Sequence, residues 1–312
     1  RKIFQVLRCL CRNYSIIPPA YIICSSSLRK SDDYALEHGG HADVWRGQYS
    51  LPTGPISVAL KAIRINAKNA SRVYPNVCQE VVMWRRLRHP RITPMLGVDT
   101  KLFPLCIVSK WVDNGTITEF LKKYPAENRL QLLLDVCEGL QYLHSETVTH
   151  GDLKSSNILI DSTRHACLCD FGLTTLIHNM DTIDPATQSN GGQGTLQYMA
   201  PEIMDPESFD LSHAHASLEG DIYALAIMMW EVFAGRPPYS NLRHIGQVHN
   251  QVLQGKRPLR PSHALSLGLS DPVWELMENC WRSNSRERPP IGHVLSIVAG
   301  AVATFTSAST LD

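Results

Sequence analysis

The chain has 312 residues, of which 44% are hydrophobic and 19% are charged, and its formal net charge at pH 7 is +1. These values are typical of a folded globular protein with one large domain or two smaller ones, and they exclude an extensively disordered chain. A charge this close to neutral also disfavours a general nucleic-acid binder, which usually carries a basic excess, so no nucleic-acid partner is expected.

Nine cysteines are scattered along the chain, at positions 9, 11, 24, 78, 106, 137, 167, 169 and 280. None forms a C-x-x-C pair, and no Cys/His cluster has zinc-like spacing. An odd, scattered set of thiols favours a reducing compartment, so we expect a cytoplasmic location, with the nucleus as an alternative. No apolar run reaches the ~18 residues that span a bilayer, and no cleavage site follows the first apolar stretch, so neither a membrane segment nor a signal peptide is expected.

Residues 1–33 are expected to form an N-terminal extension or linker. It contains a short amphipathic helix within Ile3–Cys11 that ends before two consecutive prolines. From Tyr34 onward the pattern becomes β-rich. Strand-like runs occupy 43–46, 56–63 and 106–108, and a helix is predicted over 77–87.

Beyond Gly115 the pattern becomes helical. Apolar residues recur at spacings of three and four near 117–122, 129–145, 221–233, 244–254 and 271–281, and the apolar tail 294–305 favours a packed helix. The sequence therefore predicts an α+β, bilobal fold. Its N-lobe, about 34–110, is small and β-rich with one main helix. Its C-lobe, about 113–302, is larger and helical, and 303–312 form a C-terminal tail.

One short loop carries most of the chemical signal. It reads His150-Gly151-Asp152-Leu153-Lys154-Ser155-Ser156-Asn157, and Asp170-Phe171-Gly172 follows. Asp152 is suited to accept a hydroxyl proton, and Lys154 to neutralise charge on a transferred phosphoryl group. Asn157 and Asp170 offer the oxygen ligands that suit Mg²⁺. The spacing predicts phosphoryl transfer from a nucleotide to a hydroxyl.

A lysine and a glutamate upstream support this prediction. Lys61 follows the apolar run Val58-Ala59-Leu60, where a lysine is suited to reach nucleotide phosphates. Glu80 lies on the next predicted helix, at a spacing suited to pairing with Lys61. Each residue alone has the simpler interpretation of a solvated charge, and only the combination with the loop favours a catalytic one.

From about residue 34 to 302 the chain resembles a eukaryotic protein kinase domain, particularly the tyrosine-kinase-like serine/threonine group. The matching motifs also include Ala200-Pro201-Glu202, Asp221 and Arg288, in the family's order. The resemblance implies that Glu202 pairs with Arg288 and that Asp221 holds the backbone of the catalytic loop. Both roles are structural.

The resemblance also implies an ATP site with Mg²⁺ and protein substrates. Gly39 and Gly40 fall in the glycine loop. Val44 and Ala59 would cover the adenine ring from above and Leu159 from below. Lys110, Trp111 and Val112 would form the hinge, with Ser109 in the gatekeeper position. For Val44, Ala59 and Leu159, simple core packing is the alternative.

Lys154, two residues after Asp152, and Thr195 resemble kinases that act on Ser or Thr. Three positions depart from the family pattern: Glu37 and Ala42 replace the first and third glycines of the loop, and Gly151 replaces an arginine that pairs with a phosphorylated activation segment. Gly151 predicts activity that does not need this contact. The sequence favours an active Ser/Thr kinase, with a kinase-shaped scaffold as the alternative and a tyrosine or dual-specificity kinase as a third option.

Overall fold

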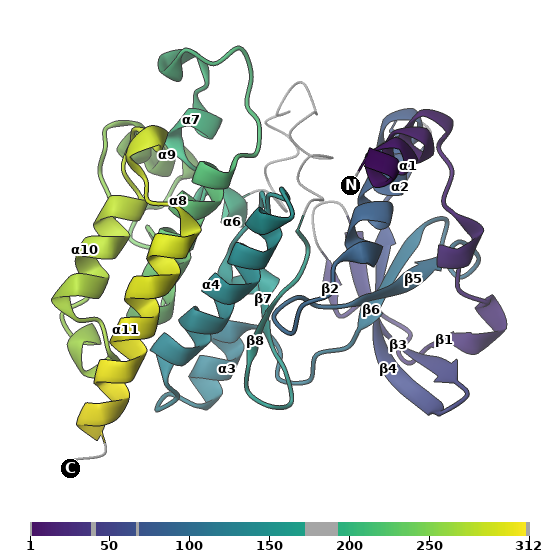
Figure 1. Ribbon diagram of the computed structural model, residues 1–312, viewed down its shortest axis with the longest axis horizontal. Helices are drawn as coiled ribbons and strands as arrows, with labels where there is room; N and C mark the ends of the chain where they lie inside the picture. Colours follow the sequence, from purple (N-terminus) through teal and green to yellow (C-terminus); the bar gives the residue numbers. More distant parts are fainter. Residues whose placement is uncertain (1, 39–41, 67–68, 172–192, 310–312) are drawn as a thin grey trace. The chain divides into compact units, whose positions relative to one another are not determined.

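The computed structural model describes residues 2–38, 42–66, 69–171 and 193–309 (Figure 1). The chain divides into two compact units, which are described separately below. The first contains the described residues of Arg1–Arg88 and Ile92–Trp111, and the second those of His89–Arg91, Val112–Asp181 and Gly192–Asp312. The first is β-rich and the second mainly helical, which confirms the predicted α+β fold with two lobes.

The first unit is built on an antiparallel sheet with the strand order β1-β3-β4-β6-β5. The short strand β2 also pairs with β3, outside this order. The strands are β1 (Leu28–Lys30), β2 (Glu37–His38), β3 (Ala42–Leu51), β4 (Gly54–Ile63), β5 (Met95–Asp99) and β6 (Cys106–Lys110). The strands predicted over 43–46, 56–63 and 106–108 are confirmed as parts of β3, β4 and β6.

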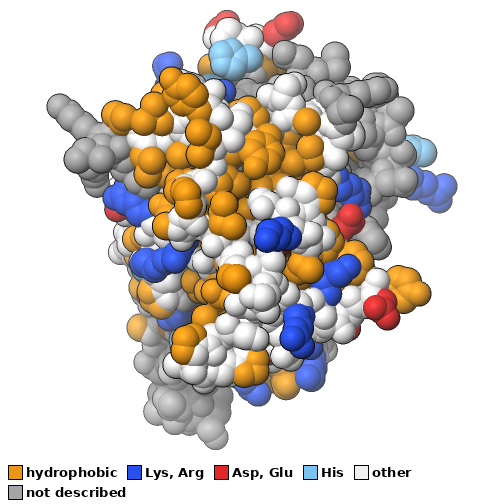
Figure 2. All heavy atoms as spheres, turned by 90° about the vertical axis from the view of Figure 1, so that its right-hand side faces the viewer, with side chains coloured by type: hydrophobic (Ala, Val, Ile, Leu, Met, Phe, Trp, Pro, Cys, Tyr) orange, Lys and Arg blue, Asp and Glu red, His pale blue; other side chains and the backbone are white. Residues whose placement is uncertain are grey.

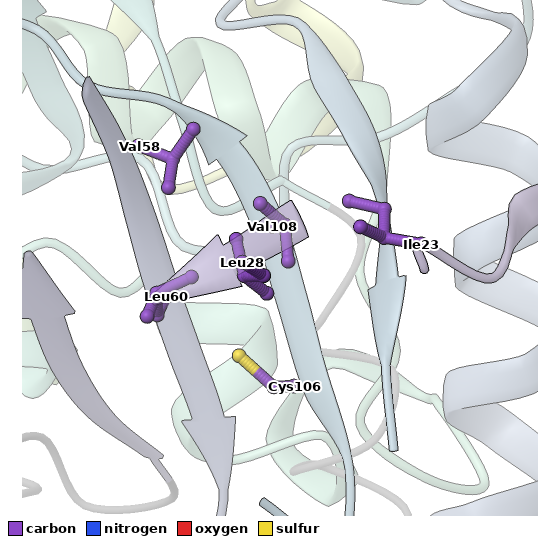
Figure 3. Packing of buried hydrophobic residues seen from close by; sticks show 6 residues of the cluster. All are labelled: Ile23, Leu28, Val58, Leu60, Cys106 and Val108. Carbon is purple, nitrogen blue, oxygen red and sulfur yellow. The ribbon is translucent and has the colours of Figure 1, made fainter. Parts of the chain in front are cut away.

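The two faces of this sheet differ in what they bury. Val58 and Leu60 of β4 are fully buried and pack with Ile23, Leu28, Cys106 and Val108 (Figure 3). Because side chains alternate along a strand, Ala59 and Lys61 lie on the opposite face. Both are only partly buried. The apolar run in β4 therefore fills the core with one set of residues and leaves the other set for a site.

Two long helices complete the first unit: α1 (Lys2–Tyr14) and α2 (Ala70–Arg86). They pack against each other (Figure 1). The helix predicted within Ile3–Cys11 is confirmed as part of α1. The helix predicted over 77–87 is confirmed as part of α2, which starts earlier, at Ala70. Pro75 lies inside α2 without ending it. Two 3₁₀ turns, Pro19–Tyr21 and Ser25–Ser27, connect α1 to β1.

The charge of the chain is unevenly distributed along the sequence. Residues 1–111 contain 17 Lys and Arg but 6 Asp and Glu, whereas residues 112–312 contain 13 and 23. On the face shown in Figure 2, Lys and Arg side chains outnumber Asp and Glu. The neutral total thus hides a basic first part and an acidic second part.

The second unit is built on long helices: α3 (Ile117–Lys123), α4 (Arg129–Ser145), α8 (Leu218–Ala234), α9 (Ile245–Leu253), α10 (Asp271–Cys280) and α11 (Ile291–Ser309). All six contain or overlap the helices predicted from periodicity. The side chains of α8 are buried almost throughout, as expected for a helix that is apolar on all sides. Helices α4 and α11 pack together, as do α8 and α10.

Shorter elements position the loops of the second unit. The hairpin of β7 (Ile158–Ile160) and β8 (Ala166–Leu168) follows the 3₁₀ turn η3 (Ser155–Asn157). The other short helices are α6 (Gln193–Leu196), α7 (Pro201–Met204), η5 (Glu207–Phe209), η6 (Ala264–Leu267) and η7 (Ser285–Glu287). None of the helices in the described part of the chain is long and apolar enough to span a bilayer. All nine cysteines are free thiols.

Candidate active site

The catalytic loop is held between the end of α4 and the β7–β8 hairpin. Two backbone hydrogen bonds give it shape. The Asn157 N–H donates to the carbonyl of Lys154 (3.0 Å), which closes η3, and the Cys169 N–H donates to the carbonyl of Asn157 (3.0 Å). The second bond ties the residue just before Asp170 to the loop that carries Asp152. The two predicted motifs are therefore brought together within the second unit.

Asp221, in the first turn of α8, fixes the start of this loop. Its carboxylate accepts hydrogen bonds from the backbone N–H groups of His150 (2.8 Å) and Gly151 (2.8 Å) and contacts Nε2 of His144 (2.9 Å). Asp221 thus contacts the backbone, as the resemblance implies. The His144 contact is one that the sequence did not indicate, because no motif marks that position.

Gly151 adopts a left-handed conformation with φ +77°. Glycine reaches this region without the steric penalty that a side chain brings. Its N–H is bound to Asp221. The glycine that replaces the expected arginine is therefore well suited to the turn before Asp152, and the anchored N–H limits the freedom that glycine adds.

Asp152 lies at the centre of a polar cluster. Its Oδ2 receives the Nζ of Lys154 (2.8 Å) and the Nδ2 of Asn157 (3.1 Å). Its Oδ1 is buried, and no donor among the described residues reaches it. A buried acceptor without a partner is costly unless a ligand or water satisfies it. One carboxylate oxygen of Asp152 is therefore still open to a hydrogen-bond donor from outside the described residues.

Lys154 links Asp152 to the segment before α7. Its Nζ donates to Oγ1 of Thr195 (2.9 Å) while also pairing with Asp152. The ammonium group has three donors, so both contacts leave one for a further acceptor. The two residues on which the Ser/Thr prediction rests are thus in direct contact.

Asn157 and Asp170 have the chemistry expected of magnesium ligands. The amide nitrogen of Asn157 donates to the backbone carbonyl of Asp152 (2.7 Å), which leaves its side-chain oxygen for coordination. Asp170 has φ +60°, an uncommon conformation for a residue other than glycine and one found at functional sites. Within the described ranges, no group of three or more His, Cys, Asp and Glu side chains is arranged so that it could hold a metal ion. One amide and one carboxylate suit Mg²⁺, which keeps several waters.

Aromatic and apolar packing supports the polar cluster. The ring of Phe171 meets that of His150 edge to face, with centroids 6.2 Å apart. Burial lowers the pKa of His150, which favours the neutral imidazole, and its Nδ1 accepts a hydrogen bond from the Asp152 N–H (3.3 Å). This arrangement orients the residue before Gly151 without adding charge near the carboxylate.

A small hollow of about 30 Å³ lies beside Asp152 in the second unit. The residues that line it include the polar Asp152 and Thr195 and the apolar Met199 and Ile203.

In the first unit, four predicted nucleotide-site residues share one face of the sheet. Val44 lies directly opposite Lys61 in the β3–β4 pair, and Ala59 lies opposite Ser109 in the β4–β6 pair. Directly opposed residues project to the same face. Gly39 and Gly40 lie outside the described residues, between β2, which contains Glu37, and β3.

Part of the predicted hinge is already hydrogen-bonded within the first unit. The N–H of Lys110 donates to the carbonyl of Pro94 (3.2 Å), and that of Trp111 to the carbonyl of Ser57 (3.1 Å). Neither N–H is therefore expected to reach an adenine edge. Val112 and Leu159 belong to the second unit, where Leu159 lies in β7 opposite Cys167.

Glu80 has a partner that the sequence did not predict. Its Oε1 forms an ion pair with Nη2 of Arg8 in α1 at 3.8 Å, whereas the spacing predicted Lys61. In the part of the chain that the structure describes, Glu80 pairs with Arg8 and not with Lys61. The physical reason is that α1 packs on α2 and brings a guanidinium to this carboxylate. Roles of Lys61 and Glu80 in ATP binding remain predictions.

Glu202 of α7 and Arg288 form the buried pair that the resemblance implies. Two parallel hydrogen bonds join them, Nη1 to Oε1 (2.6 Å) and Nη2 to Oε2 (2.7 Å). The guanidinium also donates to the carbonyls of Arg282 (2.9 Å) and Glu219 (3.0 Å). This fork satisfies both charges and connects α7 to the segment before α11.

Comparison with known proteins agrees with this geometry. The sequence pattern of the protein tyrosine and serine/threonine kinase family matches residues 32–298. The match covers most of the chain, so the chain belongs to the protein kinase family.

Individual relatives differ in the acceptor residue that their names state. The chain is 29% identical over 264 residues to serine/threonine-protein kinase STY17 of Arabidopsis thaliana, covering 83% of this chain and 42% of that protein. It is 30% identical over 259 residues to the cytoplasmic tyrosine-protein kinase BMX of Mus musculus, covering 81% and 36%. With the serine/threonine/tyrosine-protein kinase HT1 of Arabidopsis thaliana the identity is 26% over 268 residues, covering 83% and 63%. The chain spans about two fifths of the first of these relatives.

Proposed function

We propose that this chain is an active, Mg-ATP-dependent protein kinase that phosphorylates Ser and Thr residues of protein substrates. The observation that carries the proposal is the contact chain from Asp152 through Lys154 to Thr195. All residues that the chemistry requires are present at their family positions: Lys61, Glu80, Asp152, Lys154, Asn157 and Asp170. We also propose a reducing compartment such as the cytoplasm, which the nine free thiols support.

In this mechanism Asp152 orients the acceptor hydroxyl through its unpartnered Oδ1 and takes up its proton. The hydroxyl oxygen bonds to the γ-phosphorus as the bond from that phosphorus to the β–γ bridging oxygen breaks, and ADP leaves with the electron pair. Lys154 is placed to neutralise charge on the transferred group. Mg²⁺, held by Asn157 and Asp170, would supply further neutralisation of the phosphates.

The preference for Ser and Thr rests on Lys154 and Thr195. Their hydrogen bond holds the lysine beside Asp152, within reach of a phosphoryl group moving to a short side chain. The names of the relatives alone do not select the acceptor, since they include Ser/Thr, tyrosine and mixed specificities. We therefore base the choice on the site.

The test is transfer of labelled phosphate from ATP with Mg²⁺ to generic protein substrates by the full 312-residue chain. Asp152→Asn and Lys61→Met should each lower the rate by about 10²-fold or more, because each removes a group acting on the reacting atoms. Asp271→Asn, an exposed change of the same kind, should stay within about twofold. Enzyme pretreated with phosphatase should remain active, because Gly151 has no side chain to bind a phosphorylated segment.

Identifying the labelled amino acid separates the outcomes. Phosphoserine and phosphothreonine support the proposal, and phosphotyrosine as the main product contradicts the Ser/Thr preference. A folded chain that binds ATP but transfers no phosphate would show a scaffold with a kinase fold.

A further inference from the structure

The N-terminal helix α1 is a built part of the first unit. Its face toward α2 includes Cys11, which is 4% exposed, and the α2 residue Cys78 is fully buried. Burial raises the pKa of Cys78 to about 12, with a further contribution from the neighbouring Cys11. The chain after α1 is tied to the sheet, since the Ile23 N–H donates to the carbonyl of Val98 (2.8 Å) and β1 pairs with β3. This short tether keeps α1 at a high effective concentration near α2.

The contact that α1 makes with Glu80 is only partly satisfied. The Arg8–Glu80 distance of 3.8 Å exceeds hydrogen-bond length, so the attraction is electrostatic without a directed bond. Glu80 Oε2 and Arg8 Nε are both buried, and neither has a hydrogen-bond partner among the described residues. The residue Glu80 is 6% exposed, so water compensates little. Glu80 therefore lies in a site where another cation with better geometry would replace Arg8.

Lys61 is the cation that the proposed reaction requires beside Glu80, and it belongs to the same unit. The first 111 residues, most of which belong to this unit, are rich in cations, with 17 Lys and Arg against 6 Asp and Glu. The positions of these cations, and not their number, therefore decide which of them Glu80 binds. With α1 docked, the geometry selects Arg8.

We propose that Arg8 is a positioning residue that competes with Lys61 for Glu80, so that docking of α1 on α2 weakens the binding of Mg-ATP. This inference rests on the proposed function, because it assigns regulation to the same nucleotide site. Arg8 acts through Glu80 and touches neither substrate nor metal. Release of α1 frees the carboxylate to hold Lys61 in place, and the protein then needs less binding energy to order its phosphate contacts.

The test compares Arg8→Gln with Arg12→Gln in the full chain. Both changes remove one arginine from α1, but the recorded ion pair of Glu80 is with Arg8, and Arg12 contributes only a longer-range attraction. Arg8→Gln should lower KM for ATP by about threefold to tenfold with little change in kcat, since it raises the fraction of molecules ready to bind. Arg12→Gln should change KM by less than about twofold. The effect of Arg8→Gln should vanish in a Glu80→Gln background.

Two further readouts need no turnover. The dissociation constant of Mg-ADP, measured by calorimetry, should fall with Arg8→Gln. The pKa of the Glu80 carboxyl, followed by carbon-13 NMR, should also fall, because Lys61 then makes a closer pair than Arg8 did. If Arg8 were only a structural partner, its removal would raise this pKa. An unchanged or raised KM for ATP, or a raised Glu80 pKa, would overturn the inference.

These readouts separate the two proposals. If no variant and no wild-type chain transfers phosphate, the proposed function fails, and the Glu80 pKa still decides the role of Arg8. If Arg8→Gln does not fold, as judged by its melting curve, Arg8→Lys replaces it. A lysine keeps the charge but shortens the side chain, so a lowered Glu80 pKa again supports the competition and a raised one contradicts it.

Discussion

Two glutamates are buried to the same extent, and both face an arginine, yet they are bound in different ways. Glu80 of the first unit and Glu202 of the second are each 6% exposed. Glu202 receives two directed hydrogen bonds from Arg288, at 2.6 and 2.7 Å. Glu80 has one ion pair at 3.8 Å and an oxygen that no described donor reaches. Burial raises the pKa of Glu80 to about 7, with only partial compensation by Arg8 and Arg12.

The comparison shows that burial does not by itself assign a role to a carboxylate. A carboxylate whose oxygens are all filled by directed donors holds two segments together, and exchange of its partner would break several bonds at once. A carboxylate with an unfilled oxygen and a distant partner is poised to change partners. In this molecule Glu202, whose oxygens both have donors, connects α7 to the segment before α11. Glu80, which has an oxygen without a donor, is itself a predicted nucleotide-site residue.

The largest effect is expected from breaking the filled pair. Arg288→Met leaves the Glu202 carboxylate buried without its partner and also removes donors to three backbone carbonyls. The free energy of unfolding should fall by about 3–5 kcal/mol. Urea unfolding of the full chain, followed by circular dichroism, measures this change in the helical transition.

A control for this prediction lies nearby. Arg282 pairs with Glu287 at 3.4 Å, with both side chains about half exposed. Arg282→Met should lower the free energy of unfolding by less than about 1 kcal/mol, because exposed ion pairs are weak. Equal losses in the two variants would show that the directed fork adds nothing beyond an exposed ion pair.

An intermediate effect on the free energy of unfolding is expected when Glu80 is replaced. Above neutral pH this replacement should stabilise the protein, whereas Arg288→Met destabilises it. The pKa of Glu80 rises from about 4.5 in the unfolded chain to about 7 in the folded one, chiefly through burial. Its contribution to stability is therefore fully present below pH 4.5 and is lost as the pH rises to about 7. Glutamine does not titrate, so the Glu80→Gln variant does not lose this stability. Between pH 5 and pH 8 the free energy of unfolding of the variant should therefore rise relative to that of wild type by on the order of 3 kcal/mol.

Melting curves at pH 5 and pH 8 check this sign. The same substitution in the other pair, Glu202→Gln, is the matched control and should destabilise the protein at pH 8, because it removes the charge from two directed hydrogen bonds. If Glu80→Gln also destabilised the protein at pH 8, the two pairs would be alike and the comparison would fail.

The sequence predicted local features well and missed those that depend on tertiary partners. The strand β4 was predicted because its apolar run follows turn residues, whereas its buried face, with Val58 and Leu60, became visible only in the structure. The first turns of α2 were missed, because the predicted helix began at Val77, whereas α2 begins at Ala70, continues through Pro75 and packs against α1. Strand β1 has three residues and is defined only by its pairing with β3.

The site divides in the same way. Asp152, Lys154 and Asn157 lie within six residues of sequence, so their spacing already placed them in one loop. The contact of Arg8 with Glu80 joins residues far apart in the sequence, and no motif marks Arg8. Burial and the identity of a charge partner come from packing, so the regulatory contact became visible only in the structure.

The smallest effect concerns a third buried glutamate, Glu231 of α8, whose partner is uncharged. Its Oε2 accepts a hydrogen bond from the hydroxyl of Tyr198, and burial raises the pKa of its carboxyl. Tyr198→Phe removes one directed donor but leaves no opposite charge unpaired. The free energy of unfolding should fall by about 1–2 kcal/mol, less than for Arg288→Met, as measured by urea unfolding.

The control for this substitution is Tyr239→Phe, since Tyr239 is similarly buried and its hydroxyl bond to the carbonyl of Lys256 is long, at 3.4 Å. That variant should lose less than about 1 kcal/mol, because a bond at this length is weak. A Tyr198→Phe protein as stable as wild type would show that Glu231 needs no directed donor. The number of directed donors would then not rank the stability contributions of the buried glutamates. The oxygen of Glu80 that lacks a donor would in that case be no evidence that Glu80 changes partners.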